Sequence, residues 1–390
     1  MLTSNKIPRN PQDDYSDAIV NNRLSFLTEK TGTNFSYLKG KLVENSFAKG
    51  NVENFIGYAQ VPIGIAGPLK INGDFAQGDF YVPLATNEGA MVASFSRGMK
   101  IASLSGGITT KVLLDLYRVN PMLIFDSLSS ATKAKIWIEE NFNSLQKEVE
   151  KTSNFCRLEK QKITILGRRL ILSLAFKTGD ALGANMATKA TQVVLDFLVK
   201  NLEIENYLIH GQDLEKRPSG RNLIEGRGKF VTAEIKISKD TLEEKLKVTA
   251  KQLSDVCESY FIGYSHLLTM SNHLQTANLL AAIFIACGQD VAYVAESIVG
   301  TMSFEDCEDG SLIASLTLPA LLVATVGGGT NKGTSAECLT IMDCLGKGKA
   351  RKFAEIVCAS ALCGELSLAV AMIKKDLVDA HEKLNRNRPS

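Results

Sequence analysis

The chain has 390 residues, which is enough for about two or three domains that each bury a core of their own. Hydrophobic residues make up 45% and charged residues 22%, the composition of an ordinary globular protein. The net charge of +2 gives no electrostatic reason to expect a nucleic acid or a membrane surface as partner.

The first 50 residues are polar, and their sequence predicts a mainly helical N-terminal segment. Residues 1–14 lack the apolar core of a secretory signal. The longest uncharged stretch, residues 259–289, is interrupted by polar side chains, which disfavours a membrane-spanning helix. We therefore expect a cytoplasmic protein with no membrane and no nucleic-acid partner.

The eight cysteines lie mostly within apolar runs, for example Cys287 after residues 283–286. The sequence contains no CxxC pair, and its cysteines and histidines do not have the spacing of a zinc site. This pattern predicts buried free thiols in a reducing compartment and no metal.

Two segments follow this N-terminal segment. Residues 57–68 are rich in glycine and proline and predict a structured loop or short strands. Small and apolar residues dominate residues 87–104 and predict one buried helix. Glu88 opens that helix, where desolvation is expected to raise its pKa and make it a proton donor at pH 7. The alternative is an acid at a helix start, stabilised by the helix dipole.

Residues 118–209 have a different sequence pattern, which predicts short apolar strands alternating with helices. We predict strands at 121–125 and 206–210, helices at 131–141 and 185–202, and two strands around Gly167 within 163–176. The order strand-helix-strand-strand-helix-strand is ferredoxin-like, so this stretch is predicted to be an inserted module.

The last part of the chain mixes polar loops with apolar helices. Residues 211–228 are polar and glycine-rich and predict a surface or active-site loop. Residues 229–237 predict a strand, and residues 242–258 predict an amphipathic helix. The Gly-Gly-Gly run at 327–329 predicts either a plain turn or a place where the backbone approaches a ligand closely.

Three further ionisable residues are candidates for chemistry, and each has an ordinary structural alternative. Asp290 is an acid at the end of an apolar run, or it is a helix cap. Lys216 lies in a polar loop, where most lysines are merely solvated. His381 follows an apolar helix, where a lone histidine is usually structural or solvated. None of these residues is convincing alone.

Residues 178–186 read Thr-Gly-Asp-Ala-Leu-Gly-Ala-Asn-Met and open a helix after a strand. Small residues at such a helix start let a phosphate approach backbone N–H groups, although the segment lacks GxGxxG and a structural turn is the alternative. Ser94 and Arg97 lie three positions apart on one face of the predicted helix. Arg97 is therefore either a phosphate ligand or a surface cation.

Taken together, seven short strings resemble the hydroxymethylglutaryl-CoA reductases, in a form that is similar to the class I branch. They occur in the order of that family, cover roughly residues 50–386, and are jointly very specific. The strings are Glu-Asn-Phe-Ile-Gly-Tyr at 53–58, Pro-Ile-Gly-Ile-Ala-Gly-Pro at 62–68, Ala-Thr-Asn-Glu-Gly at 85–89, Gly-Asp-Ala-Leu-Gly-Ala-Asn-Met at 179–186, Ile-Glu-Gly-Arg-Gly-Lys at 224–229, Ala-Cys-Gly-Gln-Asp at 286–290 and Thr-Val-Gly-Gly-Gly-Thr-Asn at 325–331.

The resemblance implies a mixed fold, α+β or α/β, with a large domain around a long central helix. It assigns residues 1–50 to a small helical N-terminal domain, and residues 51–117 and 210–390 to the large domain, which binds the CoA substrate. Residues 118–209 become an inserted ferredoxin-like domain that binds NAD(P). The resemblance also implies a homo-oligomer, at least a dimer, with the active site at the subunit interface.

The implied activity is the four-electron reduction of (S)-3-hydroxy-3-methylglutaryl-CoA to mevalonate and CoA with two NADPH, in isoprenoid biosynthesis. Lys216 would stabilise the oxyanion that forms when hydride reaches the thioester carbonyl. Glu88 would donate protons, and Asp290 would tune Lys216 and Glu88. His381 would protonate the departing CoA thiolate.

The resemblance also assigns the binding residues, with NADPH as the cofactor. NADH stays possible because Asn154 stands where class I usually has arginine. The residues expected to line the cofactor are Ser153, Asn154, Phe155, Asp180, Leu182, Gly183, Ala184, Asn185 and Met186. Those expected to contact the substrate are Ser94, Ser96, Arg97, Arg118, His210, Glu215, Arg217 and Asn278.

Several positions around the expected acyl pocket depart from the family pattern. His210 replaces a serine, Ser259 a lysine and Gln275 a histidine. Two alternatives therefore stay open: a reductase of a different acyl-CoA on the same scaffold, and a non-catalytic protein that binds CoA or a nucleotide. Retention of all four catalytic groups argues against the second, because polar groups that are costly to bury would be lost by drift.

Overall fold

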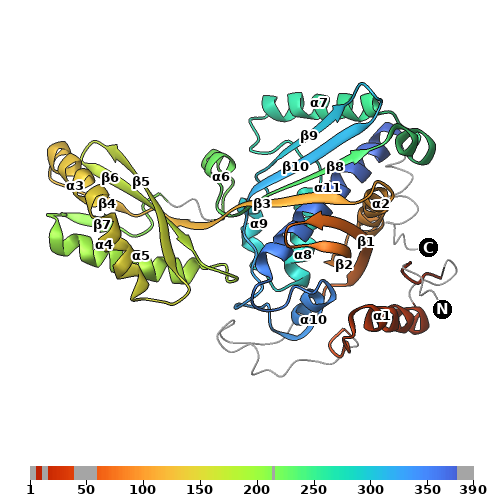
Figure 1. Cartoon of the computed structure of the whole chain (residues 1–390), viewed down its shortest axis with the longest axis horizontal. Coiled ribbons are helices and arrows are strands. Elements are labelled where there is room, and N and C mark those ends of the chain that lie inside the picture. The colour runs from red at the N-terminus through yellow and green to blue at the C-terminus, as the bar shows by residue number, and fades with distance from the viewer. Residues whose placement is uncertain (1–5, 11–15, 39–58, 213–215, 376–390) are drawn as a thin grey trace.

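The computed structural model describes residues 6–10, 16–38, 59–212 and 216–375. They form two bodies of unequal size, which the long strand β3 (Ile108–Val119) joins (Figure 1). Most of β3 pairs with strands of the large body, and its last three residues pair with a strand of the small body. The fold is mixed α and β, with mostly antiparallel strand pairing.

The sheet of the large body runs in the order β2-β1-β3-β8-β10-β9, and every pair except β1–β3 is antiparallel. Its strands besides β3 are β1 (Ile63–Gly73), β2 (Gln77–Ala85), β8 (Gly228–Ile237), β9 (Thr301–Asp306) and β10 (Leu312–Leu321). The expected strand over residues 229–237 is confirmed, and β1 extends the short strands expected near residues 57–68.

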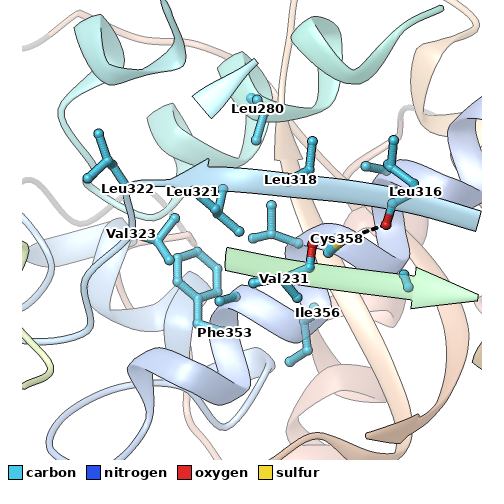
Figure 2. Close-up of a cluster of buried hydrophobic side chains, with 14 of the residues drawn as sticks. Val231, Leu280, Leu316, Leu318, Leu321, Leu322, Val323, Phe353, Ile356 and Cys358 are labelled. Atoms are coloured by element: carbon cyan, nitrogen blue, oxygen red, sulfur yellow. Dashed lines mark hydrogen bonds between the residues drawn. The ribbon is translucent and has the colours of Figure 1, made fainter. Parts of the chain in front are cut away.

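Helix α11 (Ala350–Ile373) is the central element of the large body (Figure 1). Its Phe353 and Cys358 lie in an apolar cluster with Val231 of β8 and Leu318 of β10 (Figure 2). Among the helices that the structure describes, α11 is long and apolar enough to cross a membrane, but 83% of its apolar window is buried inside the protein. It is therefore a core helix.

Helix α2 (Met91–Leu104) lies directly on α11, and two glycines permit the close approach. A Cβ atom at Gly98 would lie 1.9 Å from the carbonyl oxygen of Cys363. One at Gly364 would lie 2.2 Å from the ring of Phe95. Any larger side chain at either position would push the two helices apart.

Shorter helices complete the large body, and α1 (Asp17–Thr31) is the most N-terminal of them. Helix α1 attaches through Phe26, whose ring meets the ring of Tyr81 edge-on with centroids 5.3 Å apart. Residues 39–50 of the expected N-terminal segment lie outside the described residues. The shorter helices are α1 (Asp17–Thr31), α6 (Gly220–Glu225), α7 (Ala250–His266), α8 (Thr276–Ala286), α9 (Val294–Ser297) and α10 (Gly333–Ile341).

The helix expected over residues 242–258 is wrong in its boundaries. A π-helical turn, η2 (Thr241–Leu246), ends at Lys247, whose φ of 57° is left-handed. Helix α7 then begins after Thr249, whose hydroxyl accepts from the N–H of Gln252 while the Gln252 side chain accepts from the N–H of Thr249. This capping box starts a new helix.

The expected loop over residues 211–228 is also only partly correct, because helix α6 lies within it. Ser219 caps α6 by accepting a hydrogen bond from the N–H of Asn222. Serine is a favoured residue at a helix start, but the glycines of this segment made the sequence resemble a loop.

The small body has an antiparallel sheet in the order β7-β4-β6-β5, covered by helices (Figure 1). Each strand and helix predicted within residues 118–209 exists, and α4 is an additional helix that the sequence analysis did not predict. The elements are β4 (Met122–Ile124), α3 (Leu128–Glu140), α4 (Phe142–Glu150), β5 (Arg157–Leu166), β6 (Arg169–Lys177), α5 (Ala184–Asn201) and β7 (Asn206–Leu208).

All eight cysteines are free, and all but Cys307 are buried, as the sequence predicted. Burial raises the pKa of the Cys287 thiol well above its usual range, and it raises that of Cys338 to about 12. These thiols therefore act as small apolar side chains.

Candidate active site

Lys216 and Asp290, which the sequence places 74 positions apart, meet at the surface of the large body. The Lys216 Nζ lies 3.2 Å from Asp290 Oδ2, and both side chains are 47% exposed. The Lys216 ammonium also lies 5.3 Å from the ring centroid of Tyr293. The pair is thus open to an incoming ligand.

Asp290 also caps the short turn that follows it, η3 (Val291–Tyr293). Its Oδ1 accepts a hydrogen bond of 3.0 Å from the N–H of Ala292. The two interpretations of Asp290, a helix cap and an acid beside Lys216, therefore hold together, since each uses a different carboxylate oxygen.

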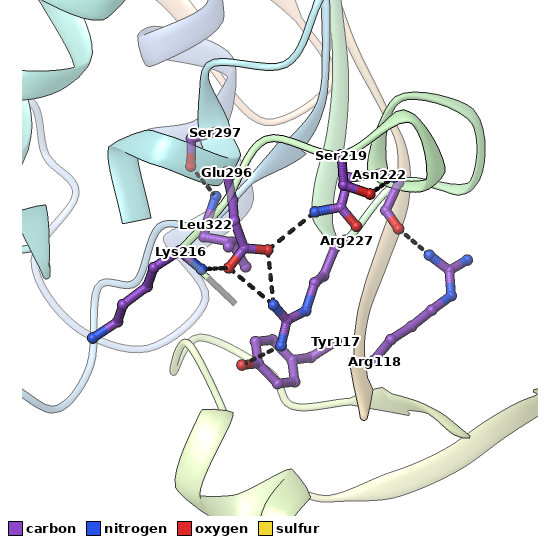
Figure 3. A network of polar contacts seen from close by, with 10 residues as sticks. Tyr117, Arg118, Lys216, Ser219, Asn222, Arg227, Glu296, Ser297 and Leu322 are labelled. Carbon is purple, nitrogen blue, oxygen red and sulfur yellow. Dashed lines mark hydrogen bonds and ion pairs between the residues drawn. The ribbon is translucent and has the colours of Figure 1, made fainter. Parts of the chain in front are cut away.

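The backbone of Lys216 is fixed by a buried carboxylate that the sequence analysis missed. Its N–H donates to Oε1 of Glu296 at 2.7 Å, and Glu296 on α9 is fully buried. The same carboxylate forms an ion pair with Arg227 at 2.7 Å and accepts from the Asn222 amide at 3.1 Å (Figure 3). An acid in the apolar run Val-Ala-Glu-Ser-Ile at 294–298 was the available signal.

Three loops lie side by side next to this pair. The Gln289 side chain exchanges two hydrogen bonds with the backbone of Ala324, at 2.8 and 3.0 Å. The N–H of Thr325 donates to the carbonyl of Asp180 at 3.0 Å. These hydrogen bonds hold together the segments around residues 180, 289 and 325. The three segments belong to three of the strings that resemble the reductase family.

The glycine run at 327–329 does bring backbone into close contact, and its neighbour is another glycine. A Cβ atom at Gly288 would lie 2.6 Å from the carbonyl oxygen of Gly329. The run thus lets the loop before Asp290 pack on the loop that follows β10.

Asp180, expected to line the cofactor, also joins the two bodies. Its carboxylate accepts from the N–H of Gly348 at 2.7 Å and from that of Ala350 at 3.1 Å. These N–H groups belong to the start of α11, where a negative charge is favourable. The Asp180 carboxylate therefore fixes the small-body loop to the central helix.

The start of α5 fits an anionic ligand. Gly183 has a φ of 90°, and a Cβ atom there would overlap the Thr178 side chain. Among the described residues no side chain caps this helix, so its first N–H groups, at the positive end of the helix dipole, are available to an anion. Leu182 and Ala184 are half-buried in the core, and Asn185 is exposed.

The second expected cofactor segment lies against this helix start. The Ser153 hydroxyl is 3.7 Å from the sulfur of Met186, and it accepts from the N–H of Phe155 at 3.0 Å. Asn154 is exposed, and Phe155 carries its ring 64% exposed, with the Nζ of Lys347 5.8 Å from the ring centroid. The residues expected at the cofactor are thus brought together.

Ser94 and Arg97 share one partner, as expected for residues on one helix face. The hydroxyl of Ser94 lies 3.1 Å from that of Ser367 on α11, and Nε of Arg97 donates to the same hydroxyl at 3.2 Å. Ser96 is half-buried on α2. Gln275, one of the departures from the family pattern, is buried and donates to Ser94 Oγ at 3.5 Å.

Arg118 lies in a small cavity where two bodies meet, with room for about one water molecule. Its guanidinium donates to the carbonyl of Gly226. Burial lowers the pKa of Arg118, Glu225 counteracts this, and two other arginines lower it further. The cavity is lined by Arg118, Asn120, Gln212, Arg221, Asn222 and Arg227.

The other expected substrate residues are more dispersed. His210 and Arg217 are exposed, and Asn278 is half-buried on α8. Ser259 is exposed on α7, where its hydroxyl donates to the carbonyl of Asp255. Glu215 lies outside the described residues.

Two expected catalytic residues are not in the pair. The buried position predicted for Glu88 is wrong for the single chain, because α2 begins only at Met91 and Glu88 is exposed in the loop before it. Left-handed Ala90, with a φ of 65°, delays the start of the helix. His381 lies outside the described residues. Among the described residues, no hydrogen bond or ion pair joins Glu88 to Lys216 or Asp290, and no group of His, Cys, Asp and Glu is arranged to hold a metal.

Comparison with known proteins gives one consistent family. The model of the hydroxymethylglutaryl-coenzyme A reductases matches residues 19–386. The 3-hydroxy-3-methylglutaryl-coenzyme A reductase of Methanocaldococcus jannaschii is 40% identical over 373 residues, covering 93% of this chain and 92% of the relative. That of Pyrococcus abyssi is 38% identical over 376 residues, with the same coverage of both chains.

A solved structure gives the same answer for the fold. The class II 3-hydroxy-3-methylglutaryl-CoA reductase from Streptococcus pneumoniae, bound to NADPH in open conformations, superposes with a TM-score of 0.74. The match covers 90% of this chain and 97% of that chain at 19% identity. At this identity the likeness shows the fold alone.

Proposed function

The chain belongs to the hydroxymethylglutaryl-coenzyme A reductase family, and on that premise we propose that it reduces (S)-3-hydroxy-3-methylglutaryl-CoA to mevalonate and CoA with two NADPH. The observation that carries this function is the exposed Lys216–Asp290 pair, 3.2 Å apart, beside the loops that resemble a cofactor site. The product is the precursor of isoprenoids, and we place the reaction in the cytoplasm.

The reaction needs two hydride transfers. The first adds hydride to the thioester carbonyl carbon and gives a hemithioacetal, which loses CoA to give an aldehyde. The second reduces the aldehyde to a primary alcohol. In each transfer negative charge develops on the carbonyl oxygen, so a fixed cation beside that oxygen lowers the barrier.

We assign that cation to Lys216. Its ammonium is within hydrogen-bonding distance of Asp290, which limits where the flexible side chain points. Asp290 itself is held by the N–H of Ala292. This support matters because a lysine alone loses considerable side-chain entropy when it is ordered.

The cofactor supplies hydride when bound, and the small body supplies its position. The uncapped first turn of α5, which begins directly after Gly183, would receive its phosphates. Ser153, Asn154 and Phe155 would cover one side of it, and Asn185 and Met186 the other. The contact between Ser153 and Met186 supports one continuous surface.

We propose a homo-oligomer, at least a dimer, with the active site at the subunit interface. Glu88 is exposed in the single chain, so a second subunit would supply the desolvation that a proton donor needs. Exposed apolar side chains support such an interface: Ile224 on α6, and Leu267 and Leu268 after α7. His381 is proposed to protonate the CoA thiolate.

The two bodies are proposed to divide the binding work. Residues 118–209 would form the ferredoxin-like insertion that binds NADPH, and the order β7-β4-β6-β5 supports this topology. Residues 51–117 and 210–390 would bind the CoA substrate, with Ser94, Ser96 and Arg97 on the CoA part. Arg118, His210, Glu215, Arg217 and Asn278 would surround the acyl group.

Replacing Lys216 tests the proposed site. Lys216→Ala is expected to lower kcat by about 10²–10³-fold or more, because it removes the oxyanion partner. NADPH binding, followed by fluorescence titration, is expected to stay unchanged. Lys236→Ala is the matched control, since Lys236 forms a similar exposed pair with Asp309 at 3.1 Å. Near-normal turnover of Lys216→Ala would show that the assignment is wrong.

A further inference from the structure

The main chain at Lys216 is held in an unfavourable conformation. Its φ of 59° is left-handed, a region that residues with a side chain rarely adopt. Such a conformation persists only where the surroundings over-determine it. The N–H of Lys216 donates to Glu296 Oε1 at 2.7 Å, which gives the turn a fixed point at its base.

Three residues, Lys216, Asn222 and Arg227, donate hydrogen bonds to the carboxylate of Glu296 (Figure 3). Arg227 at the start of β8 donates to both carboxylate oxygens, at 2.7 and 2.9 Å, and Asn222 of α6 donates to Oε2. The Arg227 guanidinium also reaches β3, where it donates to the hydroxyl of Tyr117 at 2.7 Å. Both members of the ion pair are almost completely buried.

The charges within this cluster cancel. Glu296 carries one negative charge and Arg227 one positive charge, and they are in direct contact. The pair therefore exerts little net field on the Lys216 ammonium, whose own ionic partner is Asp290. Glu296 therefore affects Lys216 by holding its main chain in position.

We propose that Glu296 is a positioning residue for Lys216: it anchors the lysine backbone so that the ammonium meets both Asp290 and the reacting carbonyl. The proposal rests on the proposed role of Lys216. It follows that loss of the anchor lowers kcat while the KM values for NADPH and the acyl-CoA stay near those of the unaltered protein. A displacement of about 1 Å in a catalytic group can cost about 10²-fold in rate.

Two substitutions separate anchoring from charge. Glu296→Gln keeps an oxygen that can accept from the Lys216 N–H but removes the charge, and Glu296→Met removes both. Anchoring predicts that the Gln variant turns over at least about tenfold faster than the Met variant. Equal losses in the two variants would assign Glu296 to charge compensation of Arg227 and overturn the proposal.

A double variant keeps the test valid if an unpaired Arg227 prevents folding. Glu296→Met with Arg227→Met removes the whole buried ion pair, and such apolar replacements are often tolerated. We expect this variant to melt near the temperature of the unaltered protein and to lose about 10²-fold in kcat. Normal kcat in the folded double variant would contradict the proposal.

The matched control is Glu355→Met. Glu355 on α11 is also fully buried and accepts backbone N–H groups, from Asp74, Phe75 and Ala76, so its loss disturbs the fold without touching the lysine turn. Its kcat is expected to stay within about threefold of normal.

The proposed function and this inference can fail separately. If the unaltered protein oxidises no NADPH, the proposed function is wrong. If it oxidises NADPH and the Glu296 variants keep a normal kcat, only the positioning role of Glu296 is wrong.

Discussion

The two bodies of the protein are stabilised in different ways. Six charged side chains are buried among the described residues of the large body. Between residues 122 and 208, all of which the structure describes, every charged side chain is at least partly exposed. The buried charges are Arg227, Lys229, Glu296, Glu337, Glu355 and Glu365. The small body is thus held by apolar packing, and the large body also depends on buried ionic anchors.

Three of these glutamates fasten chain segments that lie far away in sequence. Glu337 accepts from the N–H groups of Tyr37 and Leu38, at 2.9 Å each. Glu355 and Glu365 do the same for the turn after β1 and for the start of α8. A buried carboxylate is costly unless several donors satisfy it, so these contacts fix the loops as well as the charge.

The largest stability effect is expected in the apolar core of the small body. Phe176 on β6 is fully buried, and Phe176→Ala is expected to lower the free energy of unfolding by about 3–5 kcal/mol, measured by chemical denaturation. Phe155→Ala, at an exposed position nearby, is expected to change it by less than about 0.5 kcal/mol. Similar losses for both would mean that apolar packing does not hold this body.

Removal of a buried anchor is expected to have the next largest effect. Glu365→Ala leaves the N–H groups of Leu274 and Gln275 and the hydroxyl of Thr276 without their acceptor at the start of α8. We expect a loss of about 3 kcal/mol in the free energy of unfolding. The exposed Glu258→Ala on α7 serves as control. If Glu365→Ala left the free energy of unfolding unchanged, the large body would not depend on its buried ionic anchors, and the proposed difference between the two bodies would be wrong.

The same difference explains what the sequence could predict. The elements of residues 118–209 were predicted in the correct order because hydrophobic periodicity determines that body. The buried acids were missed because an acid such as Glu296 within an apolar run has the same local pattern as an acid on a solvated helix face. The meeting of Lys216 with Asp290 came from resemblance, since no local rule joins residues so distant in sequence.

Boundaries failed where a single residue broke the pattern. Lys247 and Ala90 adopt left-handed conformations that end or delay a helix, although lysine and alanine are themselves good helix formers. Tertiary contacts decide such positions, so local propensity does not reveal them.

The ionic contact between the two bodies is expected to give the smallest effect. Lys162 of β5 and Arg221 of α6 both donate to Glu225, at 2.6 and 3.0 Å. Partial burial by itself raises the pKa of Glu225, but these hydrogen bonds outweigh it and lower the pKa from 4.5 to about 2. The ionised form therefore stabilises the fold above pH about 4.5, and this contribution is lost as the pH falls toward about 2.

Glu225→Gln is expected to cost about 1 kcal/mol at pH 6, because Lys162 is 66% exposed and solvent screens the pair. The difference from the unaltered protein should shrink at pH 3, as measured by urea denaturation at both pH values. If the difference in the free energy of unfolding grew at low pH, its sign would be opposite to the one expected. Ionised Glu225 would then not stabilise the contact between the two bodies.

The most direct test of the central claim is NADPH oxidation by the purified protein with (S)-3-hydroxy-3-methylglutaryl-CoA, followed together with the release of free CoA thiol. We expect two NADPH to be consumed for each CoA released, with mevalonate as the product. Because His210, Ser259 and Gln275 depart from the family pattern, other acyl-CoA thioesters are measured beside it. Oxidation with none of them, or only with a different acyl-CoA, would contradict the proposed function.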